Sequence, residues 1–296
     1  MDRPTLTLLP ATELAGAAFP PPEAILAPIL SRGSQCLMYG PPGVGKSLVA
    51  LGIAHAAATG GSFLGWHAPR PHRVLYLDGY TTRAEMKRRL VLFGAPPASL
   101  HFSLTAHDTG EGLDLTELES QARLMAGWRR PELVVLDDLT GLAGPHGAAG
   151  RWNALQRFLL LQRRLERAVL LVHDIGREDQ PTGGDQLADA LDVVLALRRP
   201  TDWQAQDGAR VEIHIEKARG LDGEMFAPIG AALRDGRWHW HYARPPHFTR
   251  GVSLLEAGIG AEQMGRVLGI SRASAFRLQR QARQLGLVPP TEREKL

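Results

Sequence analysis

The chain has 296 residues, of which 44% are hydrophobic, and this length suits one large α/β domain with a small additional unit. No apolar stretch approaches the roughly 20 residues of a membrane span. Cys36 is the only cysteine, which excludes disulfides within the chain, and no secretion signal is visible, so we expect a cytoplasmic protein with no membrane partner.

The formal net charge of the chain is +3. The segment 251–288 accounts for all of this excess, because its arginines outnumber its glutamates by the same amount. An anionic polymer is the natural partner of such a segment.

The N-terminal part of the chain leads from an arm into a phosphate-binding motif. Residues 1–30 are rich in proline and alanine and are predicted to form an irregular arm. An apolar strand is predicted over Gln35–Gly40, and the pattern G-x-x-x-x-G-K-[ST] then leads into a helix predicted over Ser47–Ala58. The residues expected to surround the phosphates are Gly40, Pro41, Pro42, Gly43, Val44, Gly45, Lys46, Ser47 and Leu48.

Each part of this motif has a chemical reason. Glycines let the backbone wrap a phosphate chain with its N–H groups pointing inward, and the positive end of the helix dipole adds to the attraction. Lys46 can reach the β- and γ-phosphates of ATP, and the Ser47 hydroxyl can bind Mg²⁺. The alternative is a glycine-rich turn that happens to contain a lysine, but the full pattern between strand and helix favours nucleotide binding.

Short apolar runs alternate with helical stretches through the middle of the chain, which is typical of a mostly parallel sheet flanked by helices. Further strands are predicted over Arg73–Leu77, Leu133–Asp137, Val169–His173, Val193–Leu197 and Val211–Lys217. Further helices are predicted over Thr82–Leu92, Leu115–Trp128, Trp152–Arg167 and Asp185–Leu191.

An apolar strand that ends in a carboxylate provides a second anchor for the nucleotide. If the strand Leu133–Asp137 lies beside the phosphate loop, Asp137 is close to Mg²⁺ at the carboxyl edge of the sheet. Asp138 follows directly, and its simplest role is to cap a helix or a turn.

After Lys217 the pattern changes to short antiparallel strands. They are predicted over Glu224–Ile229, Ala231–Arg234 and Arg237–Tyr242, with Asp235-Gly236 as a hairpin turn. A metal site formed by His239, His241 and His247 is a weaker alternative, because alternation along a strand explains the pattern without one.

A compact helical unit over residues 248–290, after a linker with two prolines, is predicted to be a small all-α helix-turn-helix domain. Gly269 allows a tight turn, and Ser271 caps the second helix, predicted over Arg272–Leu285. The residues expected to bind DNA, with the first two near base edges and the others on phosphates, are Arg272, Ser274, Arg277 and Arg280. A module for protein contacts with a solvated basic face is the alternative.

Five segments, in their order along the chain, resemble the RecA-like ATPases. Among these the sequence is most similar to the RepA-type hexameric replicative helicases of plasmids and to their phage relatives. The segments are 40–47, 63–66 with 74–79, 133–137, 172–173 and 192–195. The resemblance covers roughly residues 20–240. It implies a RecA-like P-loop ATPase domain over residues 31–243, with ATP and Mg²⁺ as ligands and a ring-like homo-oligomer, typically a hexamer.

The resemblance also implies roles for three further residues. His173 occupies the position that senses the γ-phosphate, and Lys217 with Arg219 matches the cations that reach the nucleotide of a neighbouring subunit. The alternatives are a strand-end histidine bonded to a carbonyl and a solvated charged strand end. Two glycine-rich loops, 139–151 and 174–186, correspond to loops with which RecA-like proteins grip single-stranded nucleic acid, although neither is strongly basic.

The chain departs from the family at Tyr80. The family usually has a glutamate there, which polarises the attacking water, whereas a phenol with a pKa near 10 is a poor base at neutral pH. Either another carboxylate replaces it, with Asp78, Asp138 and Glu85 as candidates, or hydrolysis is slow. In the sensor, Asp174 and Arg177 stand where the family often has histidine and lysine.

Three functions compete on this evidence. The first is an oligomeric, helicase-type ATPase that acts on DNA, with slow or unusual hydrolysis. The second is an ATP-switched DNA-binding regulator with little ATPase activity. The third, an AAA+ loader-like ATPase, draws on Asp137-Asp138, but the segment around Val74–Gly79 argues against it.

Overall fold

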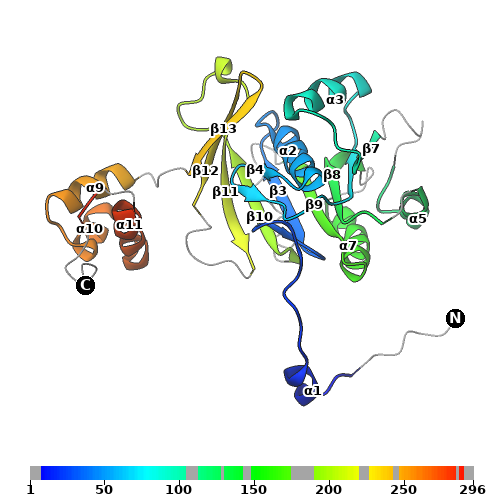
Figure 1. Cartoon of the computed structure of the whole chain (residues 1–296), viewed down its shortest axis with the longest axis horizontal. Coiled ribbons are helices and arrows are strands. Elements are labelled where there is room, and N and C mark those ends of the chain that lie inside the picture. Colours follow the sequence, from blue (N-terminus) through cyan, green and yellow to red (C-terminus); the bar gives the residue numbers. More distant parts are fainter. Residues whose placement is uncertain are drawn as a thin grey trace.

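The computed structural model describes residues 8–104, 113–127, 130–142, 148–174, 190–219, 227–242, 247–284 and 287–289. These residues form a nine-stranded sheet with helices on both faces, and three further helices follow it in the chain (Figure 1). The α/β fold predicted for the phosphate-loop part is confirmed. None of the described helices has the length and apolarity that a membrane span requires.

The sheet has a parallel part and an antiparallel part. Its strands are β3 (Gln35–Gly40), β6 (Val74–Asp78), β7 (Leu100–Leu104), β8 (Leu133–Asp137), β9 (Ala168–Asp174), β10 (Val193–Arg198), β11 (Arg210–Ala218), β12 (Ile229–Arg234) and β13 (Arg237–Tyr242). Their order is β13-β12-β11-β10-β3-β9-β8-β6-β7. The strands from β10 to β7 pair in parallel, whereas β11, β12 and β13 extend the sheet antiparallel. All carboxyl ends of the parallel strands therefore meet at one edge.

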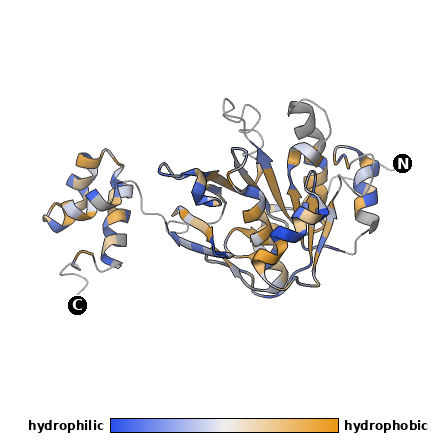
Figure 2. Ribbon diagram, turned by 90° about the horizontal axis from the view of Figure 1, so that it is seen from above, coloured by the Kyte–Doolittle hydropathy of each residue, from blue (hydrophilic) through white to orange (hydrophobic). Residues whose placement is uncertain are grey.

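The central strands are buried on both faces. Every side chain of β6 and β8 is buried, which explains why both strands are continuous apolar runs in the sequence. In β11, buried side chains alternate with partly exposed ones, so one face of the antiparallel part is more open. Figure 2 shows the same contrast, with hydrophobic residues concentrated in the central strands.

Helices cover the two faces of the sheet with two separate apolar cores. The helix α2 (Lys46–Thr59) packs on the face that includes Met38 and Tyr76. The helix α7 (Ala148–Arg164) packs on the other face, where Phe158 contacts the core around Leu37 and Val134. Smaller helices are α3 (Arg83–Leu90), α5 (Leu118–Gly127) and α6 (Leu139–Leu142).

Three predictions of local structure are wrong or incomplete. The break predicted at Gly230 is absent, because β12 runs through it and the His241 ring lies over the glycine, 2.7 Å from where a Cβ would be. The edge strand β7 was not predicted, since polar His101 and Ser103 interrupt its apolar pattern. The arm contains regular elements, namely α1 (Ala11–Gly16), β1 (Ala24–Leu26) and β2 (Leu30–Ser31). The helix predicted over Asp185–Leu191 lies almost wholly outside the described residues.

The three C-terminal helices form a unit with its own apolar core. They are α9 (Phe248–Glu256), α10 (Ala261–Leu268) and α11 (Arg272–Gln284), and they lie apart from the sheet in Figure 1. Met264 and Leu278 are central to the core. As predicted, Gly269 ends α10 in a left-handed conformation (φ +66°), and the Ser271 hydroxyl accepts a hydrogen bond from the Ser274 N–H at 3.1 Å.

A buried carboxylate at the amino edge of the sheet shares two arginines, Arg32 and Arg70, with Glu23 of the arm. Glu132, just before β8, accepts hydrogen bonds from Arg70 Nη2 at 2.8 Å, from the Arg73 N–H at 3.1 Å and from Arg32 Nη2 at 3.4 Å. Burial alone would raise the pKa of Glu132, but the hydrogen bonds from Arg70 and Arg73 outweigh it and lower the pKa to about 2.

We expect Glu132→Gln to lower the free energy of unfolding by about 3 kcal/mol at pH 7, because it removes one partner of a buried ionic cluster. The wild-type carboxylate loses this contribution as the pH falls from about 4.5 toward 2, so the difference between the two proteins should shrink. Urea unfolding at pH 7 and pH 3 measures it. Glu166→Gln, which changes an exposed partner of Arg32, is the control. An equal loss at both pH values would contradict the ionic explanation.

Candidate nucleotide-binding site

The predicted phosphate loop lies between β3 and α2, as the motif requires. Its glycines are needed for different structural reasons. Gly43 (φ +74°) and Gly45 (φ +106°) adopt backbone conformations that other residues rarely adopt. Gly40 is needed for space, because a Cβ there would lie 2.5 Å from the carbonyl oxygen of Leu197 on neighbouring β10. The backbone therefore has the path that the sequence pattern predicts.

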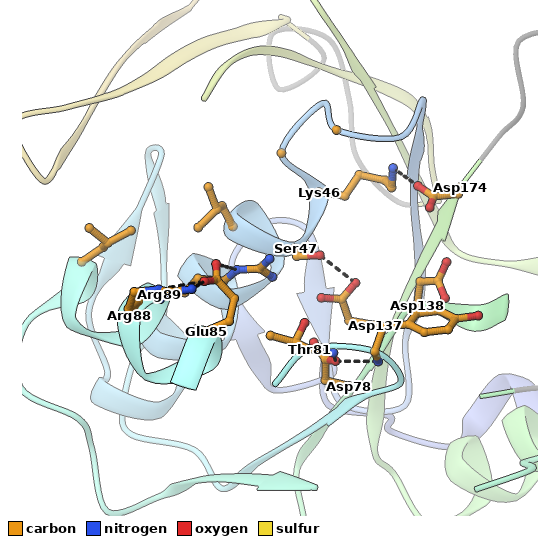
Figure 3. A pocket seen from close by; sticks show the side chains of 15 residues that line it. Lys46, Ser47, Asp78, Thr81, Glu85, Arg88, Arg89, Asp137, Asp138 and Asp174 are labelled. Carbon is orange, nitrogen blue, oxygen red and sulfur yellow. Dashed lines mark hydrogen bonds and ion pairs between the residues drawn. The ribbon is translucent and has the colours of Figure 1, made fainter. Parts of the chain in front are cut away.

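Lys46 is buried, with only 6% of its surface exposed, and its ammonium group is fully engaged. Nζ donates hydrogen bonds to the carbonyl oxygens of Gly40 and Pro41, both at 2.9 Å. It also pairs with the carboxylate of Asp174, at the end of β9 (Figure 3). A phosphate that approaches Lys46 therefore competes with Asp174, a contact that sequence reasoning missed because Asp174 was seen only as an altered sensor residue.

Ser47 and Asp137 meet although their elements are not adjacent. Ser47 Oγ donates to Asp137 Oδ1 at 3.1 Å, and the Tyr76 hydroxyl donates to Asp137 Oδ2 at 2.5 Å. In the sheet, β9 lies between β3 and β8, so the strand of Asp137 is not the neighbour of the strand that leads into the phosphate loop. The loop reaches past the end of β9, which brings Ser47 to the Asp137 carboxylate.

The environment of Asp137 is suited to a cation. Burial raises its pKa to about 6, the hydrogen bond from Tyr76 opposes the shift, and the charge of Asp78 adds to it. A buried carboxylate next to other carboxylates is stabilised by a divalent ion, and Asp137 with the Ser47 hydroxyl supplies the oxygen ligands that Mg²⁺ prefers. The residues present fit Mg²⁺.

Three carboxylates, Asp78, Glu85 and Asp138, are candidates for the role expected of a glutamate at position 80, and they differ in their surroundings. Asp78 is buried and accepts hydrogen bonds from the N–H groups of Tyr80 and Thr81. Glu85 pairs with two arginines of α3. Asp138 lines the cavity that also contains Lys46 and Ser47 of the phosphate loop, and its carboxylate accepts a hydrogen bond from the Gly141 N–H at 3.0 Å. Burial raises the pKa of Asp138 above the ordinary value of an aspartate, and a carboxylate with a higher pKa is a stronger proton acceptor.

Tyr80 is no substitute base, since it turns largely to solvent with 65% of its surface exposed. Its ring lies over α6, where a Cβ on Gly141 would be 2.7 Å from the ring. It still lines the cavity, of about 680 Å³, that extends from the phosphate loop to α3. The cavity residues that sequence reasoning missed include Arg88 and Arg89 of α3 and Leu92 in the turn that follows it. The run Lys87-Arg88-Arg89 was the signal that could have indicated them.

The other predicted site residues are placed at both edges of the sheet. His173 pairs with Tyr39 across β9 and β3 and so lies beside the start of the phosphate loop. Lys217 and Arg219 lie at the opposite edge, because β11 runs antiparallel and Lys217 pairs with Val194 near the start of β10. From Glu212, at the loop edge, to Lys217 the strand rises about 16 Å. The structure therefore keeps both cations away from the phosphate loop of their own chain.

The predicted nucleic-acid contacts are described only in part. Most of the loop 174–186, residues 143–147 of the loop 139–151 and Arg177 lie outside the described residues. Within α11, Arg272, Arg277 and Arg280 are exposed, and Arg277 Nη2 donates to Ser274 Oγ at 3.0 Å.

Among the described residues, no group of histidine, cysteine and acidic side chains that could hold a metal ion was found, so the weaker histidine-site alternative gains no support.

Comparison with known proteins agrees with the geometry of the phosphate loop. A family model described as an AAA domain matches residues 2–180, which is more than half of the chain. No curated protein matches the sequence. The matched residues include the phosphate loop, Asp137 and His173, and they end before β10 and the three C-terminal helices.

We expect Asp137→Asn to stabilise the nucleotide-free protein at pH 7.5 while it abolishes Mg²⁺-dependent ATP binding. The difference between the ordinary pKa of 3.8 and about 6 corresponds to about 3 kcal/mol. Because the pKa is raised in the folded state, this penalty grows as the pH rises from about 4 to about 6, is complete above about 6 and is absent below about 4. Chemical unfolding at pH 4 and pH 7.5 without Mg²⁺ checks the sign. A variant less stable than wild type at pH 7.5 would contradict the burial argument.

We expect Asp174→Asn to bind ATP about fivefold more tightly, because it removes the carboxylate that competes for Lys46. This corresponds to about 1 kcal/mol, the upper range for a partly exposed ion pair. Equilibrium titration with a fluorescent ATP analogue measures it. Asp202→Asn, which breaks an exposed pair with Arg210 outside the cavity, is the matched control. Weaker binding by Asp174→Asn would mean that the carboxylate assists the nucleotide.

Proposed function

The chain belongs to the AAA domain family, and we propose that it is an oligomeric ATPase that binds Mg²⁺-ATP and acts on DNA. The observation that carries the proposal is the complete phosphate loop closed onto Asp137 by the Ser47 hydroxyl. We infer a helicase-type role in the processing of DNA, in agreement with the resemblance to RepA-type proteins. Hydrolysis is slow because the usual glutamate is Tyr80.

Each part of the nucleotide and its Mg²⁺ would be held by particular groups of the chain. The N–H groups of the loop and the first turn of α2 bind the phosphate chain, and Lys46 turns from Asp174 to the phosphates. Ser47 and Asp137 hold Mg²⁺, which supplies charge neutralisation on the β- and γ-phosphates when bound. Asp137 must be ionised for this role, which Mg²⁺ itself favours.

Asp138 is the proposed general base. It lines the cavity together with Lys46, and burial raises its pKa above the ordinary value of an aspartate. A positioned carboxylate accepts a proton from water as the water attacks the γ-phosphate, a contribution of about 10²–10⁴ in rate. His173 is proposed to contact the γ-phosphate from the neighbouring strand.

Lys217 and Arg219 are proposed to complete the site of a neighbouring subunit. Their position at the edge opposite to the phosphate loop supports this, since a head-to-tail ring brings opposite sides of two subunits together. Cations supplied in this way stabilise the charge that develops on the γ-phosphate and make hydrolysis depend on assembly. A closed ring, a hexamer by the family resemblance, satisfies this requirement for every subunit.

The three C-terminal helices are proposed to bind duplex DNA as a helix-turn-helix unit. The short turn between α10 and α11, the capped start of α11 and its exposed arginines support this proposal. Arg272 and Ser274 are placed at the first turn of α11, where base edges come within reach. Arg277 and Arg280 follow on the same helix and suit phosphates.

One observation favours a second candidate, the ATP-switched regulator. Tyr80 replaces the water-polarising glutamate and points largely into solvent, so no strong base stands at that position. In this case ATP binding sets the assembly state and the C-terminal unit selects a DNA site, with little turnover.

Turnover of ATP separates the two candidates. We expect Asp138→Asn to lower steady-state turnover at saturating ATP by about 10²–10⁴ without loss of ATP binding, because only the base is removed. Tyr80→Glu should raise turnover at least about tenfold. Lys46→Ala, which loses binding or turnover, is the negative control. Unchanged turnover in Asp138→Asn would contradict the assignment of the base, and negligible wild-type turnover with DNA would favour the regulator.

Substitution of the exposed arginines of α11 tests whether this helix binds DNA. We expect the triple variant Arg272→Ala, Arg277→Ala, Arg280→Ala to lose at least about tenfold in affinity for duplex DNA at moderate salt, because phosphate and base contacts are removed. Fluorescence anisotropy with a labelled duplex measures it, and deletion of residues 251–296 should give at least as large a loss. Arg237→Ala, on exposed β13, is the control. Full affinity after the deletion would refute the assignment.

A further inference from the structure

The N-terminal arm exposes apolar side chains that its own chain does not cover. Every residue from Leu8 to Pro22 is exposed, and α1 has no buried residue. The large apolar side chains Leu8, Leu9, Leu14 and Phe19 are between 49% and 86% exposed. Glu13 is the only charged residue from Leu8 to Pro22.

Such a segment is not stable alone in water. A helix shorter than about 12 residues is marginal by itself, and α1 has six. Pro20, Pro21 and Pro22 favour an extended backbone after it, which holds α1 away from the sheet (Figure 1). The arm therefore needs a surface elsewhere on which to bury its apolar residues.

The outward face of α7 has the matching character. The stripe of Leu155, Phe158, Leu159 and Gln162 is buried, as expected for a helix on a sheet. The opposite stripe should be polar, yet Leu160 and Leu161, together with Leu165 in the following turn, are between 38% and 61% exposed. Arg157 and Arg164 lie at helical spacing beside these leucines and make no ion pair with another described residue.

We propose that the arm of one copy of this chain docks on the outward face of α7 of a second copy. The apolar side chains of α1 and Phe19 cover Leu160, Leu161 and Leu165, while Glu13 pairs with Arg157 or Arg164 of the neighbour. Each chain then offers one arm and one receiving face, so the contact is head-to-tail and propagates to a ring or a chain of subunits. This inference rests on the self-assembly in the proposed function and names the surface that produces it.

The experiment measures the mass of the full chain in solution by light scattering and sedimentation, from about 1 to 50 µM. We expect an arm variant (Leu14→Asp, Phe19→Asp) and a face variant (Leu160→Asp, Leu161→Asp) each to shift the wild-type oligomer to monomer, with at least a tenfold weaker association. Leu118→Asp, which changes a leucine of α5 that is 71% exposed, is the control and should assemble as wild type does.

Mixing the variants tests docking between copies. The face variant retains an arm and the arm variant retains a face, so an equimolar mixture should form one-to-one dimers, whereas each variant alone stays monomeric. Glu13→Arg should weaken assembly, and its combination with Arg157→Glu and Arg164→Glu should restore it. Failure of the mixture to form dimers, or undiminished oligomers in both variants, would overturn the inference.

The same proteins separate this inference from the proposed function. ATP affinity in the arm and face variants should match wild type, since neither change touches the phosphate loop. Oligomers that persist in both variants refute the arm contact and leave the ring intact. A wild-type chain that is monomeric over the whole range, with and without Mg²⁺-ATP, overturns both.

Discussion

The hydrogen bond between Ser47 and Asp137 is the contact on which the site depends. It joins the first turn of α2 to the end of β8, although β9 lies between β8 and the strand that leads into the phosphate loop. Parallel strands in register align their carboxyl ends, so a loop that crosses one strand end reaches the next. The position of the Asp137 carboxylate relative to the phosphate loop is thus fixed by the order and register of the strands.

The charged groups beside the phosphate loop bear on nucleotide binding and on hydrolysis in different ways. Lys46 pairs with Asp174, and carboxylates outnumber cations among the residues that line the cavity, so the site has a surplus of negative charge that a divalent ion would offset. The pKa of Asp137 and that of Asp138 are raised mainly by burial, which is compatible with the roles proposed for them, metal binding for Asp137 and proton acceptance for Asp138. The phosphate loop is complete, whereas the glutamate that the family resemblance leads us to expect is replaced by Tyr80.

The two edges of the sheet have different tasks. The carboxyl edge carries the phosphate loop, whereas the amino edge carries Lys217, Arg219 and the Glu132 cluster from which the arm departs. The end of α7 also lies at the amino edge, because it leads directly into β9. The phosphate loop and the proposed assembly groups therefore lie at opposite edges of the same sheet.

The sequence by itself determined the local elements and the phosphate loop. Gly40–Ser47 and the apolar run ending at Asp137 are recognisable because backbone conformation and burial on both faces demand particular residue types within a few positions. Strand order, the placement of Lys217 and Arg219 at the far edge, the pairing of Asp174 with Lys46 and the run of β12 through Gly230 were decided only by tertiary structure. Each of these depends on contacts between residues distant in the chain, where pairing partners, burial and neighbouring charges leave no local pattern.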